Sequence, residues 1–157
     1  MKKIVVIGIG NLLRKDDGIG IILLEKIIKR KNELPKNIDY IDGGTGGINL
    51  LHLIQRYETI IFLDAVNFNG KVGESKLIKL ENIKQKNIIS SMSTHSFDIL
   101  KVIEISKKID KNSKNIFIFA VQVKDVSFGL SISKELNKKI KQIVENLMEN
   151  IKKIKGR

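Results

Sequence analysis

Short apolar runs alternate along the chain with longer segments in which apolar residues recur every three or four positions. The short runs have the length and β-branched content of strands that are buried on both faces. The longer segments have the spacing of helices that bury one side. Strands are therefore predicted over residues 4–7, 38–41, 59–63 and 115–123, and helices over residues 17–30, 48–57, 96–109 and 136–154.

The pattern is weakest between residues 65 and 93. The dipeptide Asn69-Gly70 predicts a turn, and residues 76–80 predict an edge strand that pairs antiparallel with the sheet. Residues 82–92 read as a loop, and a long irregular loop in a compact domain is often functional.

Strands that alternate with helices of ten or more residues predict an α/β protein. We expect a three-layer α/β/α architecture, with a mostly parallel twisted sheet of about five strands and helices on both faces. No internal repeat, low-complexity tract or linker interrupts the pattern, so residues 1–157 are predicted to form a single domain.

Composition narrows the class of protein. The chain has 157 residues, of which 42% are hydrophobic, as in an ordinary globular domain. No apolar run has the roughly 18–20 residues that a membrane span requires, and the first residues lack the features of a signal peptide. The absence of cysteine excludes disulfides, thiolate metal sites and cysteine nucleophiles. A cytoplasmic protein without a membrane partner is expected.

The formal net charge of +12 raises the question of nucleic-acid binding. Eight Lys or Arg residues against three Glu lie in residues 133–157, and the other positive charges are scattered. Only 5% of the residues are aromatic and none is Trp, so a stacking platform for single-stranded nucleic acid is poorly supplied. We interpret the charge as a solvated surface and expect no nucleic-acid partner.

Polar residues gather where the predicted strands end. They are Asn11, Asp16 and Asp17 after the first strand, Asp42 and Thr45 after the second, and Asp64 after the third. The carboxyl ends of parallel strands lie at one edge of a sheet, and so do the helix starts that follow them. His95 stands at such a helix start, so Asp17, Asp64 and His95 are predicted to converge.

Two carboxylates and one imidazole suit a borderline divalent cation such as nickel, zinc, cobalt or iron. Three protein ligands leave coordination positions open for chemistry. A simpler interpretation stays open for each residue, since an aspartate at a strand end often caps a loop and a histidine beside Ser and Thr often only starts a helix. His52 lies inside a helix among leucines, where a solvent-facing or partly packed side chain is expected.

Other chemistries fit poorly. Gly8 and Gly10 are followed by Leu13 where a dinucleotide fingerprint requires a third glycine. The adjacent acids Asp16 and Asp17 would repel a phosphate that a helix N-terminus otherwise attracts. The G-x-S-x-G motif of serine hydrolases and the H-E-x-x-H motif of zinc proteases are both absent.

Four motifs carry a family resemblance: GIGNLLRKDDGIG at residues 8–20, IDGGTGG at 41–47, IIFLDAV at 60–66 and MSTHS at 92–96. In this order and spacing they resemble the maturation endopeptidases of [NiFe] hydrogenases. The resemblance extends from residue 4 to the final helix.

The resemblance implies a function and a site. Such an enzyme removes a C-terminal extension from the hydrogenase large-subunit precursor after nickel has been inserted. By their motif positions, Asp17, Asp64 and His95 would be both the catalytic residues and the ligands of the nickel, which the substrate carries. The precursor is then the expected partner, and a monomer the expected state. The alternatives are a metal-dependent hydrolase of small molecules and a non-catalytic chaperone for nickel and precursor. The general base and the role of Asp16 stay open.

Overall fold

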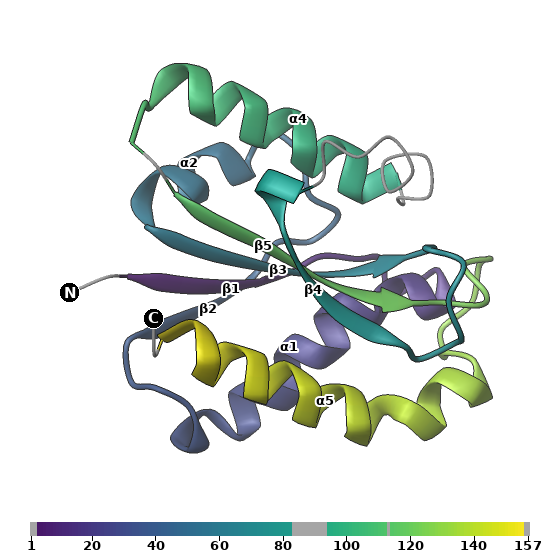
Figure 1. Ribbon diagram of the computed structural model, residues 1–157. Coiled ribbons are helices and arrows are strands. Elements are labelled where there is room, and N and C mark those ends of the chain that lie inside the picture. Colours follow the sequence, from purple (N-terminus) through teal and green to yellow (C-terminus); the bar gives the residue numbers. More distant parts are fainter. Residues whose placement is uncertain (1–2, 83–93, 113, 156–157) are drawn as a thin grey trace.

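The computed structural model describes residues 3–82, 94–112 and 114–155. One five-stranded sheet runs through this part of the chain in the order β2-β1-β3-β5-β4 (Figure 1). The strands are β1 (Ile4–Gly8), β2 (Ile38–Asp42), β3 (Thr59–Val66), β4 (Ser75–Lys79) and β5 (Asn115–Gln122). β1, β2, β3 and β5 pair in parallel, and β4 pairs antiparallel with β5. The predicted antiparallel edge strand is confirmed.

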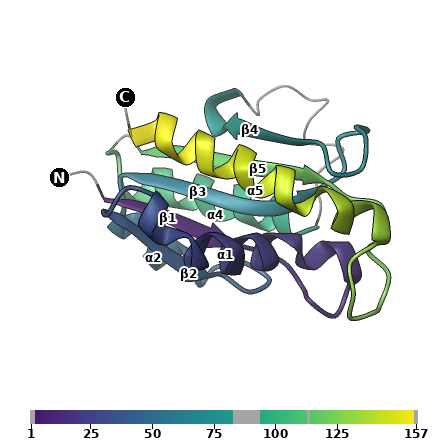
Figure 2. The same cartoon turned by 90° about the horizontal axis from the view of Figure 1, so that it is seen from below.

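Helices cover both faces of the sheet. They are α1 (Ile19–Lys29), α2 (Leu50–Arg56), α4 (Thr94–Ile109) and α5 (Lys134–Lys155). α1 and α5 lie on one face, and α2 and α4 lie on the other (Figures 1 and 2). The described part of the chain therefore confirms the predicted three-layer α/β/α class. No described helix has both the length and the apolar character needed to span a lipid bilayer.

The central strands divide their side chains between two apolar cores. Ile61 and Leu63 of β3 pack toward α1 and α5 together with Phe119 of β5. Ile60 and Phe62 of the same strand pack toward α2 and α4. Successive side chains of a strand point to opposite faces, so a strand covered by helices on both faces is apolar at most of its positions.

Two predicted boundaries are wrong in a way that affects the site. The helix predicted from residue 17 begins only at Ile19, because Lys15–Gly18 form a 3-10 turn. The strand predicted over residues 59–63 continues to Val66, because β5 pairs with it residue by residue as far as Gln122. Asp64 therefore lies within a strand and not after it. Of the predicted 82–92 loop, Asn82 closes a 3-10 turn that begins at Leu80, and the remainder lies outside the described residues.

The glycine-rich segment after β1 brings α1 against the sheet. A Cβ atom on Gly20 would lie 2.2 Å from the carbonyl oxygens of both Ile9 and Leu63. A Cβ on Gly10, where φ is +154°, would lie 2.2 Å from the Asp17 carbonyl oxygen. Gly20 is required because the first turn of α1 rests directly on backbone of β3 and of the segment after β1, and Gly10 is required because the 3-10 turn lies against that segment.

We expect Gly20→Ala to lower the free energy of unfolding by about 3 kcal/mol or more, since its methyl group would overlap two carbonyl oxygens that cannot move independently. Gly44→Ala is the comparison: nothing lies within 4 Å of its Cβ position, and only its φ of +58° opposes the change, at about 1 kcal/mol. Urea unfolding of both variants measures the difference. Equal losses of unfolding free energy in the two variants would show that the close backbone contacts at Gly20 do not exclude a side chain there.

Candidate active site

The 3-10 turn of Lys15–Gly18 presents two adjacent aspartates at the carboxyl edge of the sheet. This is the edge toward which β3 and β5 run in Figure 1. Asp16 and Asp17 are both buried, yet their carboxylates have different partners. Asp17 faces His95, and Asp16 faces the loop that follows β5.

Asp17 and His95 are in direct contact. The Nε2 atom of His95 lies 2.9 Å from Oδ2 of Asp17, and the two side chains are 17% and 8% exposed. The backbone N–H of Asn11 donates to the same Asp17 oxygen at 3.1 Å. The contact joins the turn after β1 to the first turn of α4, so it forms only when the sheet brings residues 78 positions apart together.

The pKa of His95 is raised above its ordinary value of 6.5. The hydrogen bond to Asp17 is the main cause, and it outweighs the burial that lowers the pKa. The charges of Asp17 and Asp64 and a hydrogen bond with the Thr45 backbone act in the same direction as the main cause. The site therefore favours a positive charge at the imidazole.

Asp64 is close enough to this pair for its charge to act on His95. Its side chain is fully buried on β3, at the position paired with Ala120 of β5. Its charge reaches His95, but no three His, Asp or Glu side chains within the described ranges are close enough together to hold a metal ion as a group. The ligand set of Asp17, Asp64 and His95 thus stays a prediction. Of these three residues, the structure shows direct contact between Asp17 and His95.

The geometry of the pair fits a divalent cation. Two donors that each lie about 2.1 Å from an ion and subtend about 90° are about 3.0 Å apart. The Nε2–Oδ2 separation of 2.9 Å is close to this value. Nε2 and Oδ2 are therefore close enough together to be neighbouring ligands of one cation once the Nε2 proton is lost.

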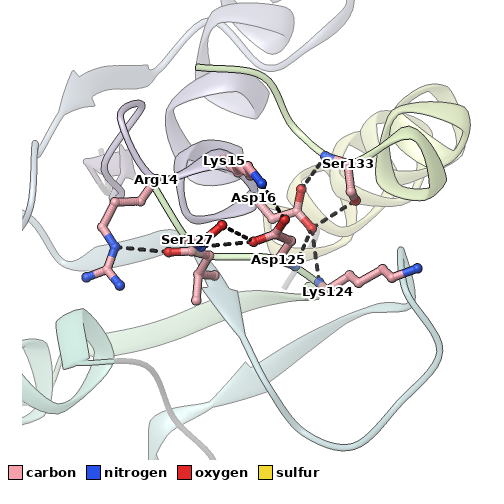
Figure 3. Close-up of polar contacts among 8 residues, drawn as sticks. Arg14, Lys15, Asp16, Lys124, Asp125, Ser127 and Ser133 are labelled. Atoms are coloured by element: carbon pink, nitrogen blue, oxygen red, sulfur yellow. Dashed lines mark hydrogen bonds and ion pairs between the residues drawn. The ribbon is translucent and has the colours of Figure 1, made fainter. Parts of the chain in front are cut away.

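Asp16 has a structural role. Its Oδ2 accepts hydrogen bonds from the backbone N–H groups of Lys124 and Asp125 at 3.0 and 3.1 Å, and from the Ser133 hydroxyl at 2.9 Å. Its Oδ1 accepts from the Ser133 N–H at 2.6 Å. Figure 3 shows the carboxylate between the loop after β5 and the start of α5. Asp16 thus anchors that loop, which answers the question the sequence left open.

The other candidates from the strand ends have local roles. Asp42 accepts a hydrogen bond from the Gly44 N–H at 2.8 Å, and the Asn11 side chain accepts one from the Leu13 N–H at 2.9 Å. Both are side-chain turns of the kind that Asp and Asn commonly form. His52 is exposed on α2, as expected. Ser133 caps α5, because its hydroxyl accepts from the Leu136 N–H at 3.4 Å.

Sequence reasoning assigned no role to the side chain of Gln122, the last residue of β5. Its buried side chain accepts hydrogen bonds from the Phe68 and Gly70 N–H groups and donates to Asn67 and the Val123 carbonyl. It therefore holds the loop that follows β3, next to the strand that carries Asp64. An amide at the end of an otherwise apolar strand was the available signal.

Comparisons with known proteins place this architecture in one class, a doubly wound α/β fold shared with hydrogenase-processing enzymes. The structure superposes on the hydrogenase maturating endopeptidase HybD of E. coli with a TM-score of 0.81 at 20% identity, covering 96% of this chain and 93% of that one. The [NiFe] hydrogenase maturation protease HybD of Thermococcus kodakarensis gives 0.78 at 21% identity, covering 96% and 99%. At these identities the likeness establishes the fold alone.

Sequence comparison establishes the family. The hydrogenase maturation protease family model matches residues 22–150, so the chain belongs to the hydrogenase maturation protease family. The hydrogenase expression/formation protein HupD of Thiocapsa roseopersicina is 26% identical over 148 residues, which cover 94% of this chain and 66% of that one. The chain spans about two thirds of the length of the first curated relatives it matches.

The raised pKa of His95 predicts a pH effect on stability. The contact with Asp17 stabilises the folded protein fully below pH 6.5, the ordinary pKa, and this contribution is lost as the pH rises through the higher folded-state pKa. NMR titration of the imidazole signals measures the pKa, and His95→Gln identifies which signals belong to His95. In Asp17→Asn the pKa of His95 should fall, and an unchanged titration would contradict the assigned cause.

Asp16→Ala should lower the free energy of unfolding by at least about 3 kcal/mol, because three N–H groups and one hydroxyl lose a buried acceptor. Asp42→Ala is the matched control, since its carboxylate is exposed and accepts one turn hydrogen bond, and its cost should stay under about 1 kcal/mol. Urea unfolding compares the two. A loss at Asp16 no larger than at Asp42 would refute the anchoring role.

Proposed function

We propose that this protein is an endopeptidase that removes the C-terminal extension of a [NiFe] hydrogenase large-subunit precursor after nickel insertion, and that it recognises the nickel in that precursor. The observation that carries the proposal is the contact between Asp17 and His95 at the carboxyl edge of the sheet. Family membership supports the reaction class. The names of the structurally similar HybD proteins support it further, because they describe those proteins as a maturating endopeptidase and a maturation protease.

The electrostatics of the site favour a cation. The pKa of His95 is raised chiefly by the hydrogen bond to Asp17, so the surroundings stabilise positive charge at Nε2. In the absence of metal, a proton on Nε2 would supply this charge and form the hydrogen bond to the Asp17 carboxylate. Nickel in the precursor would replace this proton, with Nε2 and the Asp17 oxygen as neighbouring ligands.

Asp64 would complete the ligand set. Its carboxylate is fully buried and already acts on His95 through its charge. A buried carboxylate next to an imidazole provides a strong reason for a divalent ion to enter, because the ion offsets the cost of burying negative charge. Cleavage of the peptide bond would thus require that these three residues first bind the nickel in the precursor.

Cleavage adds water across the scissile peptide bond. Nickel seated in the precursor can lower the barrier either by polarising the scissile carbonyl oxygen or by supplying a bound hydroxide. Both routes make cleavage conditional on the metal, since neither operates on an empty precursor. We further propose that the protein acts as a monomer, in the cytoplasm, and without a resident metal of its own.

The test is a cleavage assay with nickel-loaded and nickel-free precursor, followed by mass spectrometry of the precursor. Wild type should release the extension only from the nickel-loaded form. Asp17→Ala and His95→Ala should lower kcat/KM by at least about 100-fold, the scale of a lost charge-stabilising contact in an active site. Asp42→Ala, at the same edge of the sheet, should retain activity.

Each rival function gives a different result in this assay. A chaperone would bind the precursor and leave it intact. A metal-dependent hydrolase of small molecules would bind its own metal ion tightly without the precursor, which calorimetry with divalent cations would detect. Equal cleavage of the nickel-free precursor would exclude recognition of the nickel and leave a protease of another kind.

A further inference from the structure

Two loops at the carboxyl edge of the sheet expose large apolar side chains. Phe128 and Leu130 are each 83% exposed, far more than is usual for their residue types. They lie in the loop between β5 and α5, and the turn after β1 adds further apolar residues. We call this set the apolar platform: Leu12, Leu13, Val126, Phe128 and Leu130.

The platform is held together by backbone contacts between its two loops. The Gly129 N–H donates to the Leu13 carbonyl at 2.9 Å, and the Lys15 N–H donates to the Gly129 carbonyl at 3.0 Å. The Asp16 N–H donates to the Asp125 carbonyl at 3.0 Å. The buried Asp16 carboxylate accepts hydrogen bonds from the backbone of the same loop (Figure 3). An exposed apolar surface on a fixed backbone loses little conformational entropy when a partner covers it.

Two lysines beside the platform are paired with acids, and Arg14 packs on the platform itself. Lys15 forms a salt bridge with Asp125 at 2.6 Å, and Lys124 forms one with Glu135. The Arg14 guanidinium lies 5.6 Å from the centre of the Phe128 ring, and its Nε donates to the Val126 carbonyl at 3.0 Å. Covering the platform therefore leaves few bare charges to desolvate.

The platform is continuous with the candidate active site. Leu12 follows Asn11, whose N–H bonds the Asp17 carboxylate. A Cβ on Gly18, the residue after Asp17, would meet the Leu12 side chain at 2.9 Å. A folded protein that brings a metal ion to Asp17 must therefore lie over the Leu12 side of this surface.

We propose that the apolar platform docks the hydrogenase large-subunit precursor through an apolar surface next to its nickel, and that this docking does not depend on the nickel. The inference rests on the proposed function and adds the means by which the substrate is held. A second copy of this chain fits less well, because each copy has a formal net charge of +12. Five side chains also form a patch of only a few hundred Å², which suits a transient contact between enzyme and substrate better than a lasting dimer, since a stable interface takes about 800 Å² from each partner.

The test compares wild type with the double variant Phe128→Ser/Leu130→Ser. Ile109→Ser is the matched control, since Ile109 is 61% exposed at the C-terminal end of α4, away from the site. The double variant should bind both nickel-free and nickel-loaded precursor at least about tenfold more weakly. Its KM should rise by a similar factor while kcat at saturation is retained, and urea unfolding should match wild type. The control should behave as wild type.

The outcomes separate this inference from the proposed function. If wild type cleaves the precursor and the double variant binds and cleaves it equally well, the platform does not dock the substrate, although the proposed function stands. If wild type binds the precursor without cleaving it and the double variant does not bind, docking is supported and the proposed function fails. A wild-type dimer in sedimentation equilibrium that the double variant abolishes would show that the platform serves self-association, which would overturn the inference.

Discussion

The carboxyl edge of the sheet depends on one buried carboxylate. Asp16 is fully buried, and such a group is tolerated only when its oxygens are satisfied by donors. Donors come from Lys124, Asp125 and Ser133, all more than a hundred residues away in the chain. Satisfying this one group therefore sets the path of the loop after β5 and the start of α5. It also fixes the turn that carries the adjacent aspartate.

Two neighbouring acids thus have separate roles because the 3-10 turn sends them in different directions. Asp16 is satisfied by neutral donors and serves the structure. Asp17 contacts His95 and raises its pKa, and under the proposed function these two residues would receive the nickel ion. The bonds of Asp16 fix the backbone of the turn that carries Asp17, and a fixed backbone positions a functional side chain more precisely.

The same anchor connects the candidate site to the surface around it. The loop that Asp16 holds presents Phe128 and Leu130, and the turn that carries Asp17 presents Leu12 and Leu13. Under the two proposals, the substrate would dock on the loop that Asp16 holds, and its nickel would be recognised at the turn that carries Asp17. This arrangement suits an enzyme whose substrate is a folded protein with a metal ion inside.

The sequence by itself determined the class of fold and the positions of the acids. The apolar runs identified the central strands β1, β3 and β5 because strands covered on both faces are mostly apolar, and Asp17 and His95 could be selected because strand ends and helix starts share one edge. Only the tertiary structure decided that Asp64 lies within β3, since pairing with β5 extends that strand beyond its apolar run. It also decided that Asp16 is structural and Asp17 is not, because identical side chains one position apart differ only in the distant groups that surround them.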